Sequence, residues 1–426
     1  MFDLSWGTLW LMLLCIVISI MYRGYVTPFF EKSDRKRVDS IFFAAIAVRV
    51  IWYFIYFAFI ADSYPFMITD DYNYYFRAVA ASASPSLGRN NYQTFLNYLY
   101  HFLGASSFNG RLVNFFASVL CVYPIAYIDR AINYQSGKFT ATKMYCFFPF
   151  MITICSFEIK DIFSMFFFAT SCMILMAFQR EKKNRIISFV FFCVMSELVR
   201  GGMGLLVLGV YGCTIFHQKL GGTSTHKGKK TFAYVCVITL ILVMVVVLMS
   251  TEYYSDTMSL LGQYTAGRDK SISSGSMFDF LTIHNINEIW KVPLDLLFYI
   301  MLPNSSEHVG RFMLDFGVYF RWFDVPVTIL GVYWMIRNCK KFGLYSLCVI
   351  VPYVYLACFQ IITFREVIFI VPLIYIFAVN YLCPEDDQGS HTLTMVKLGR
   401  RKVNYRVAIL IAMYCVWFVF VLLRVR

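Results

Sequence analysis

The sequence predicts an all-α polytopic membrane protein with about 12 transmembrane helices, helices on its outer face and a long outer loop. Of the 426 residues, 59% are hydrophobic and only 15% are charged, whereas a soluble domain is about 45–50% apolar and about 25% charged. The mean hydropathy is +0.62, and long apolar runs recur along the chain. Such a chain would aggregate in water, so the composition excludes a soluble enzyme, a disordered chain and a secreted disulfide scaffold.

The predicted spans are the runs that approach about 20 apolar residues, the length that crosses the hydrocarbon core. Several middle runs are shorter, and we interpret them as paired hairpins. The first run has no basic leader and no small-residue cleavage site, so it is expected to be a retained helix. Residues 1–426 are treated as a single integral membrane domain. The expected spans are 5–22, 41–61, 111–128, 144–157, 162–178, 186–199, 202–217, 231–250, 314–336, 343–361, 367–383 and 407–423.

Basic residues predict the orientation. The chain has 38 Lys and Arg against 25 Asp and Glu, a net charge of +13. In a membrane protein this excess marks cytoplasmic loops, so no nucleic-acid partner is expected. Of the 38 basic residues, 24 fall in loops that alternate strictly with less basic ones. We therefore expect the first outer loop at 62–110, the long outer loop at 251–312 and both termini to be outside. The loops assigned to the cytoplasm are 23–40, 129–143, 179–185, 217–230, 337–342 and 384–406.

The first outer loop contains an acidic pair, Asp70-Asp71, beside an apolar stretch at 92–103 that is too short to span. We interpret this stretch as a helix lying on the outer surface. Two adjacent carboxylates at the membrane surface suit an acid/base or cation site, and aromatic rings suit stacking on sugars. The alternative is a solvated turn with an N-cap aspartate. The neighbouring aromatic residues are Tyr72, Tyr74 and Tyr75.

The second outer turn is very short and carries Glu158, Lys160 and Asp161. Three charges in one hairpin at the membrane boundary are functional candidates, because charge near the bilayer is costly. The alternative is a turn that keeps helix ends hydrated, with both carboxylates paired to Lys160.

Two hairpin tips on the same side carry arginines. Arg200 follows Glu197, which could pair with it from one turn earlier, and Arg365-Glu366 lies at the top of the 343–383 hairpin. A guanidinium can grip a phosphate through paired hydrogen bonds. The alternative is a snorkelling anchor to lipid phosphates.

Together, these groups favour chemistry on a lipid-bound anion. Asp71 or Asp70 would deprotonate an acceptor sugar hydroxyl as general base, while Arg200 and Arg365 would hold the leaving phosphate. Glu158 and Asp161 complete the expected catalytic carboxylates. The expected substrate-binding residues are Lys160, Arg200, Arg365, Glu366, Tyr74 and Tyr75.

No cofactor is required by the sequence. Paired carboxylate oxygens suit Mg²⁺ or Mn²⁺, so a divalent cation at the acidic turns is an alternative that the sequence leaves open. The 13 cysteines lie in apolar segments or at their cytoplasmic ends, without a Cys-x-x-Cys pair. We expect them to be small buried hydrophobes and not metal ligands.

The order and sidedness of these features resemble the GT-C superfamily of membrane glycosyltransferases and the related bacterial polysaccharide polymerases of the Wzy and EpsG types. In GT-C members the first outer loop bears an acidic pair and surface helices, here Asp70-Asp71 and 92–103. The next outer turn bears further acidic residues, here Glu158 and Asp161. The resemblance covers 41–200 best.

Two further patterns carry the resemblance. The run 148–161, from Phe-Pro to Lys-Asp, is similar to one common in polysaccharide-pathway members, and Arg365 with Pro372 beyond it is similar to their carboxy-terminal signature. One departure concerns the first helix: the helix before the acidic loop is normally the first, and here it is the second. An outside amino terminus is common in Wzy- and EpsG-type polymerases.

The resemblance implies a glycosyltransferase at the outer face of a bacterial plasma membrane that polymerises O-antigen, capsule or exopolysaccharide. Its implied donor is a polyprenyl-phosphate- or polyprenyl-diphosphate-linked saccharide. Expected partners are this saccharide, membrane lipid and proteins of chain-length control or export.

The competing interpretation is a transporter or flippase of the same lipid-linked oligosaccharides, which about 12 spans would suit. Transporters usually show internal symmetry and polar groups at mid-bilayer. This sequence has no half-to-half match, and Arg49 is its one clear charge deep in a predicted span.

Overall fold

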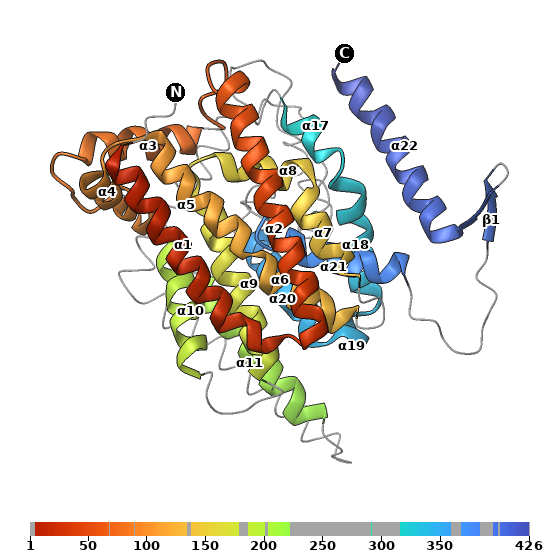
Figure 1. Ribbon diagram of the computed structural model, residues 1–426. Coiled ribbons are helices and arrows are strands. Elements are labelled where there is room, and N and C mark those ends of the chain that lie inside the picture. Colours follow the sequence, from red (N-terminus) through yellow and green to blue (C-terminus); the bar gives the residue numbers. More distant parts are fainter. Residues whose placement is uncertain are drawn as a thin grey trace.

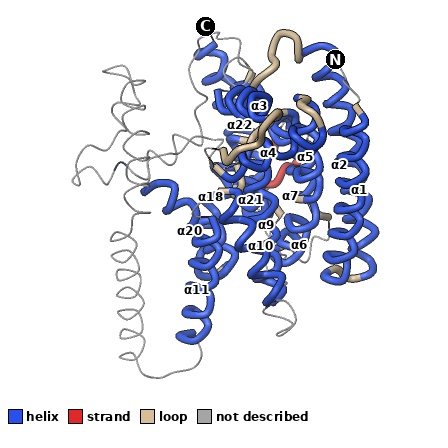
Figure 2. The backbone as a smooth tube through the Cα atoms, turned by 90° about the vertical axis from the view of Figure 1, so that its left-hand side faces the viewer, coloured by secondary structure: helices blue, strands red, loops and turns tan. Residues whose placement is uncertain are grey.

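The computed structural model describes residues 5–67, 69–88, 90–133, 138–178, 186–200, 203–221, 291, 316–358, 368–383, 395–398 and 401–425. Within these ranges the chain is helical apart from one short hairpin of two strands, and most helices run roughly side by side (Figures 1 and 2). The first half comprises α1 (Trp6–Val26), η1 (Thr27–Phe29), α2 (Lys32–Ile55), η2 (Tyr56–Ile60), α3 (Thr69–Ala81), α4 (Asn91–Leu103), α5 (Ser107–Leu120), α6 (Val122–Ile132), α7 (Thr140–Phe147), α8 (Pro149–Thr153), η3 (Ile154–Ser156) and α9 (Lys160–Phe178).

The second half comprises α10 (Ile186–Val199), α11 (Met203–Gly221), α17 (Gly317–Arg321), α18 (Val325–Arg337), α19 (Cys339–Phe342), α20 (Leu344–Cys358), α21 (Val371–Leu382), β1 (Met395–Leu398), β2 (Arg401–Asn404) and α22 (Tyr405–Val425). Strands β1 and β2 pair antiparallel, with Val396 opposite Val403. This hairpin lies in a segment that the sequence predicted as a loop.

Five helical stretches in the described part of the chain are long and apolar enough to cross a membrane: Trp6–Phe29, Lys32–Ile60, Ser107–Ile132, Lys160–Ala177 and Tyr405–Leu423. Four shorter apolar helices, Ile186–Val199, Met203–Gly212, Val325–Arg337 and Val371–Leu382, coincide with further predicted spans. The expectation of about 12 crossings is not confirmed, because these helices are shorter than the about 20 residues a crossing needs. The predicted span at 231–250 lies outside the described residues.

The helices at the edge of the bundle present large apolar side chains outward. On α1, Trp10 is 64% exposed and Met21 is 69% exposed, and on α22 Val416 is 72% exposed. A soluble protein rarely exposes a contiguous apolar surface of this kind. Together with the length of these helices, the exposed apolar side chains are those of a membrane protein.

The predicted span 144–157 is not one helix. α7 ends at Phe147 and α8 begins with Pro149, because proline lacks an N–H and its ring excludes a continuous helix. The buried Arg49 of α2 donates to the carbonyl oxygen of Cys146 at 3.2 Å, near the end of α7, and to Ser118 Oγ at 2.9 Å. The break turns the chain through η3 toward Glu158.

One end of the bundle is covered by α3 and α4, beside the first residues of α1 and the start of α5 (Figure 1). We call it the α4 end. η1, which lies in the basic segment 23–40, is at the opposite end (Figure 1). The predicted surface helix at 92–103 is helical, and Asn90 caps it by accepting a hydrogen bond from the Gln93 N–H at 2.9 Å.

Helix α4 is amphipathic. Tyr92, Leu96 and Tyr100 are buried against the bundle, whereas Phe102 on the other face is 74% exposed. A helix with one buried and one exposed apolar face suits the boundary between water and lipid.

Candidate functional site

The carboxylate of Asp71 joins two loops at the α4 end. Asp71 lies in the first turn of α3 and is fully buried. One of its oxygens accepts the backbone N–H of Met67 at 2.9 Å, and the other accepts the backbone N–H of Glu158 at 2.7 Å. Asp71 therefore ties the first predicted outer loop to the second acidic turn.

Glu158 is the second buried carboxyl group of the cluster. Its Oε2 accepts a hydrogen bond from the Tyr100 hydroxyl at 2.6 Å. Its Oε1 is buried and makes no hydrogen bond in the part of the chain that the structure describes. A buried polar atom without a partner is costly and calls for an explanation. This oxygen is therefore the candidate contact for a reacting group.

Helix α5 holds the turn around Glu158 in place. The Asn114 amide donates to the carbonyl oxygens of Phe157 at 2.6 Å and Ile159 at 3.0 Å. At Gly110, a Cβ atom would lie 2.6 Å from both Cδ and Oε2 of Glu158. The missing side chain at Gly110 is thus what admits the carboxyl group.

Arg111 is the positive charge of the cluster, and it is 3% exposed. Its Nη2 donates to the carbonyl oxygen of Pro65 at 2.5 Å, and its guanidinium carbon lies 5.6 Å from the Tyr56 ring centre. Its Nε makes no hydrogen bond within the described ranges. The guanidinium offsets the charge of the buried carboxylates, which lowers the cost of burying them.

Burial sets the protonation of this cluster. It raises the pKa of Glu158 to about 8, with the Tyr100 hydrogen bond and Arg111 opposing the shift and Asp71 adding to it. Burial also raises the pKa of Asp71, against Arg111 and the two backbone N–H groups that its oxygens accept. The pKa of Tyr100 is raised well above its ordinary value, so its hydroxyl remains a donor. A carboxyl with a pKa near neutrality is suited to exchange protons with a substrate.

The structure pairs two residues to which the sequence gave separate roles. Arg200 Nη1 lies 3.0 Å from Asp161 Oδ1, and their side chains are 15% and 2% exposed. This ion pair joins the start of α9 to the end of α10. Glu197 accepts the backbone N–H of Gly204 at 2.9 Å. Lys160 is half-buried at the start of α9.

The predicted aromatic residues divide into buried and exposed ones. Tyr74 is buried between α3 and α4, 5.0 Å from the Tyr92 ring, so it is not placed to stack on a sugar. Tyr75 is half-buried, and its ring lies 6.2 Å from that of Tyr100. Tyr72 is 47% exposed. Burial of Tyr74 follows from its position on the face of α3 that packs on α4.

Of the three remaining predicted site residues, the structure describes only Asp70. Asp70 precedes Asp71 in α3 and is half-buried. Arg365 and Glu366 lie outside the described residues.

A divalent cation at the acidic turns, which the sequence leaves open, would have to compete with existing contacts of Asp71. Both oxygens of Asp71 accept backbone N–H groups, and the guanidinium of Arg111 acts electrostatically on this carboxyl group. Among the described residues, no group of three His, Cys, Asp or Glu side chains is arranged to hold a metal.

Sequence reasoning missed three contributors on α4 and α5: Tyr100, Gly110 and Arg111. The sequence could have marked Arg111 as a candidate, because it is a charged residue at the first position of a predicted span, where charge is costly. Tyr100 and Gly110 had none, because their roles depend on contacts across 58 and 48 positions of sequence with Glu158.

Comparison of the chain with protein-family models, curated proteins and solved structures finds no match.

Proposed function

We propose that this protein is a membrane glycosyltransferase that uses polyprenyl-(di)phosphate-linked saccharides, with Glu158 as the group that accepts the proton. The observation that carries the proposal is the buried Oε1 of Glu158, unpartnered among the described residues, beside Asp71, Arg111 and Tyr100 at one end of a membrane bundle. The resemblance to GT-C glycosyltransferases and to Wzy- and EpsG-type polymerases supports the same chemistry.

The proposed reaction breaks one bond and forms one. The ionised carboxylate of Glu158 takes the proton of an acceptor sugar hydroxyl at Oε1. The hydroxyl oxygen forms a bond to the anomeric carbon of the donor, and the bond from that carbon to the phosphate oxygen breaks. Polyprenyl phosphate or diphosphate leaves with the bonding electrons. Arg200, which is partly exposed and paired with Asp161 three residues after Glu158, is the proposed contact for the developing charge of the phosphate.

The geometry changes the role proposed for Asp71. A general base needs an oxygen that can reach a substrate proton, and both oxygens of Asp71 accept backbone N–H groups. Asp71 is therefore proposed as a positioning residue that fixes the backbone of Glu158. Because Tyr100 covers the Glu158 carboxyl, the proposal includes a displacement of α4 when the acceptor binds.

The proposed setting is the outer face of a bacterial plasma membrane, in the polymerisation of O-antigen, capsule or exopolysaccharide. Two features support this sidedness: the acidic cluster lies at the α4 end, and the basic segment 23–40 lies at the opposite end, as basic loops on the cytoplasmic side would. The proposed partners are the lipid-linked saccharide, membrane lipid and proteins of chain-length control or export.

The test of this function is Glu158→Gln, which keeps the shape of the side chain and its bond to Tyr100 but cannot accept a proton. Membranes containing the variant are supplied with a defined lipid-linked saccharide, and polymer formation and donor binding are measured. We expect product formation to fall at least about 100-fold, the usual lower range for loss of general-base catalysis, with donor binding retained.

The matched control is Glu31→Gln, an exposed glutamate at the N-cap of α2 at the opposite end, which should leave product formation unchanged. Product formation by Glu158→Gln at the wild-type rate would refute the proposed role. Passage of intact donor across the membrane without product formation in the wild type would identify a carrier instead.

A further inference from the structure

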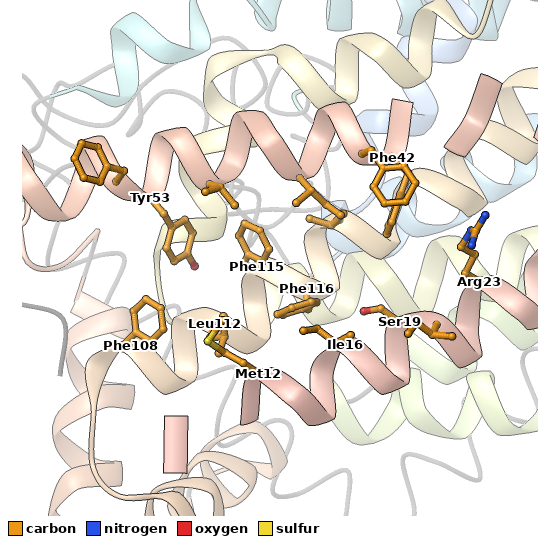
Figure 3. Close-up of a pocket in the computed structure, with 16 residues that line it drawn as sticks. Met12, Ile16, Ser19, Arg23, Phe42, Tyr53, Phe108, Leu112, Phe115 and Phe116 are labelled. Atoms are coloured by element: carbon orange, nitrogen blue, oxygen red, sulfur yellow. The ribbon is translucent and has the colours of Figure 1, made fainter. Parts of the chain in front are cut away.

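A groove runs along the bundle between α1, α2 and α5. It has a volume of about 560 Å³, within the range of about 300–1,000 Å³ typical of ligand sites. Figure 3 shows side chains of the three helices pointing into it, with Phe108 at one end and Arg23 at the other. Along α1 the wall extends from Met12 to Arg23, which at 1.5 Å per residue is about 16 Å, or about half the hydrocarbon core.

The polar groups in the wall are already engaged. Ser19 donates to the carbonyl oxygen of Cys15 at 2.7 Å. Arg23 forms a two-point ion pair with Asp39, at 3.0 and 2.6 Å. The Tyr53 hydroxyl lies 2.6 Å from the carbonyl oxygen of Arg111. The remaining lining is aliphatic and aromatic, so the groove offers mainly a hydrocarbon surface.

The groove is connected to the candidate site through the side chain of Tyr53. The ring of Tyr53 lines the groove, and its hydroxyl contacts the carbonyl oxygens of Arg111 and Cys155. On α5, Leu112 lines the groove directly after Arg111 of the charged cluster. One end of the groove therefore lies against the residues that hold the charged cluster.

We propose that this groove binds the polyprenyl chain of the lipid-linked donor, which holds the attached phosphate and sugar near Glu158. The inference rests on the proposed function. Val50 and Phe54 of α2 are 51% and 61% exposed, so this wall faces the surface from which a membrane lipid would enter.

The test uses binding without sugar transfer. Purified full-length protein in phospholipid nanodiscs is photolabelled with polyprenyl phosphate that carries a diazirine in its chain, and the labelled peptides are mapped. We expect labels on α1, α2 and α5, reduced about tenfold by excess unlabelled polyprenyl phosphate and unchanged by excess phospholipid. Equal labelling by a diazirine phospholipid would mean that ordinary membrane lipid occupies the groove, and it would overturn the proposal.

A matched pair of variants localises the binding. Val50→Trp fills the groove, while Val194→Trp places the same bulk on α10, at a valine with the same exposure of 51% that is not part of the groove. We expect Val50→Trp to reduce labelling about tenfold and Val194→Trp to leave it unchanged. Ile16→Trp fills the groove from α1 and serves if Val50→Trp does not fold.

The two sets of variants test the lipid-binding groove and the proposed role of Glu158 independently. Unchanged labelling in both groove-filling variants, while Glu158→Gln abolishes transfer, would refute the groove and keep the proposed function. Labelling that the groove-filling variants abolish, while Glu158→Gln transfers sugar at the wild-type rate, would keep the groove and refute the role of Glu158.

Discussion

At Glu158, burial and hydrogen bonding act on the same carboxyl group. Full burial raises its pKa to about 8, and the Tyr100 hydroxyl fixes Oε2 at 2.6 Å. An exposed glutamate would be ionised at neutral pH and would have little driving force to accept a proton. A buried one is a stronger base once ionised, and the structure orients it by one hydrogen bond and by its backbone bond to Asp71.

The raised pKa of Glu158 predicts how stability depends on pH. The folded-state pKa of Glu158 is about 8, above the ordinary value of 4.5. The stability that this carboxyl group contributes is therefore fully present below about pH 4.5, and it is lost as pH rises through about 8. At about 1.4 kcal/mol per pH unit, the loss is on the order of 5 kcal/mol. Thermal unfolding of purified protein should show Glu158→Gln gaining stability over the wild type as pH increases from 5 to 9. A constant difference across this range would contradict the assignment.

At the scale of elements, the candidate site is held between two helices: α5 fixes the backbone around Glu158, and α4 contacts the Glu158 carboxyl group through Tyr100. Asn114 of α5 fixes the turn before α9 through two carbonyl oxygens, and Arg111 of the same helix faces the first loop through Pro65. The proline break between α7 and α8 directs the chain back to the α4 end. The site therefore depends on how closely α5 approaches the Glu158 turn.

Gly110→Ala tests this close approach. Alanine favours a helix over glycine by about 0.8–1 kcal/mol, but a Cβ at this position would meet Glu158 at 2.6 Å. We expect Gly110→Ala to lower transfer activity by about tenfold or more and to lose the stabilisation that helix propensity alone would give. Activity assays and thermal unfolding on the same preparations measure both effects.

Gly212→Ala is the matched control, because a Cβ there meets nothing within 4 Å. It should retain activity and gain stability from helix propensity. Equal behaviour of the two variants would show that the contact between α5 and Glu158 is unimportant.

At the scale of the whole molecule, apolar runs and basic loops predict the helical segments well, because both follow from the cost of exposing or burying single side chains. Each predicted span within the described residues coincides with helix in whole or in part. The count of crossings was harder to predict, since Pro149 breaks one run and several helices are short.

The site was predicted only in part. The acidic pair and the second acidic turn are brought into contact through Asp71 and the Glu158 N–H at 2.7 Å. Composition can place such charges at the same end of a bundle, but it cannot tell which carboxylate has both oxygens satisfied and which has an oxygen without a partner. That distinction depends on Tyr100 and Gly110, which are far away in sequence, and it moves the proposed base from Asp71 to Glu158.

The central claim, that a buried carboxyl accepts the acceptor's proton, is tested most directly by the pH–rate profile of sugar transfer. Purified protein in a bilayer is given a defined lipid-linked donor and acceptor, and kcat is measured between pH 6 and 9. We predict a rate that rises with pH and levels off with an apparent pKa near the value of about 8 for Glu158. A rate that is flat over this range, or that falls as pH rises, would contradict the claim.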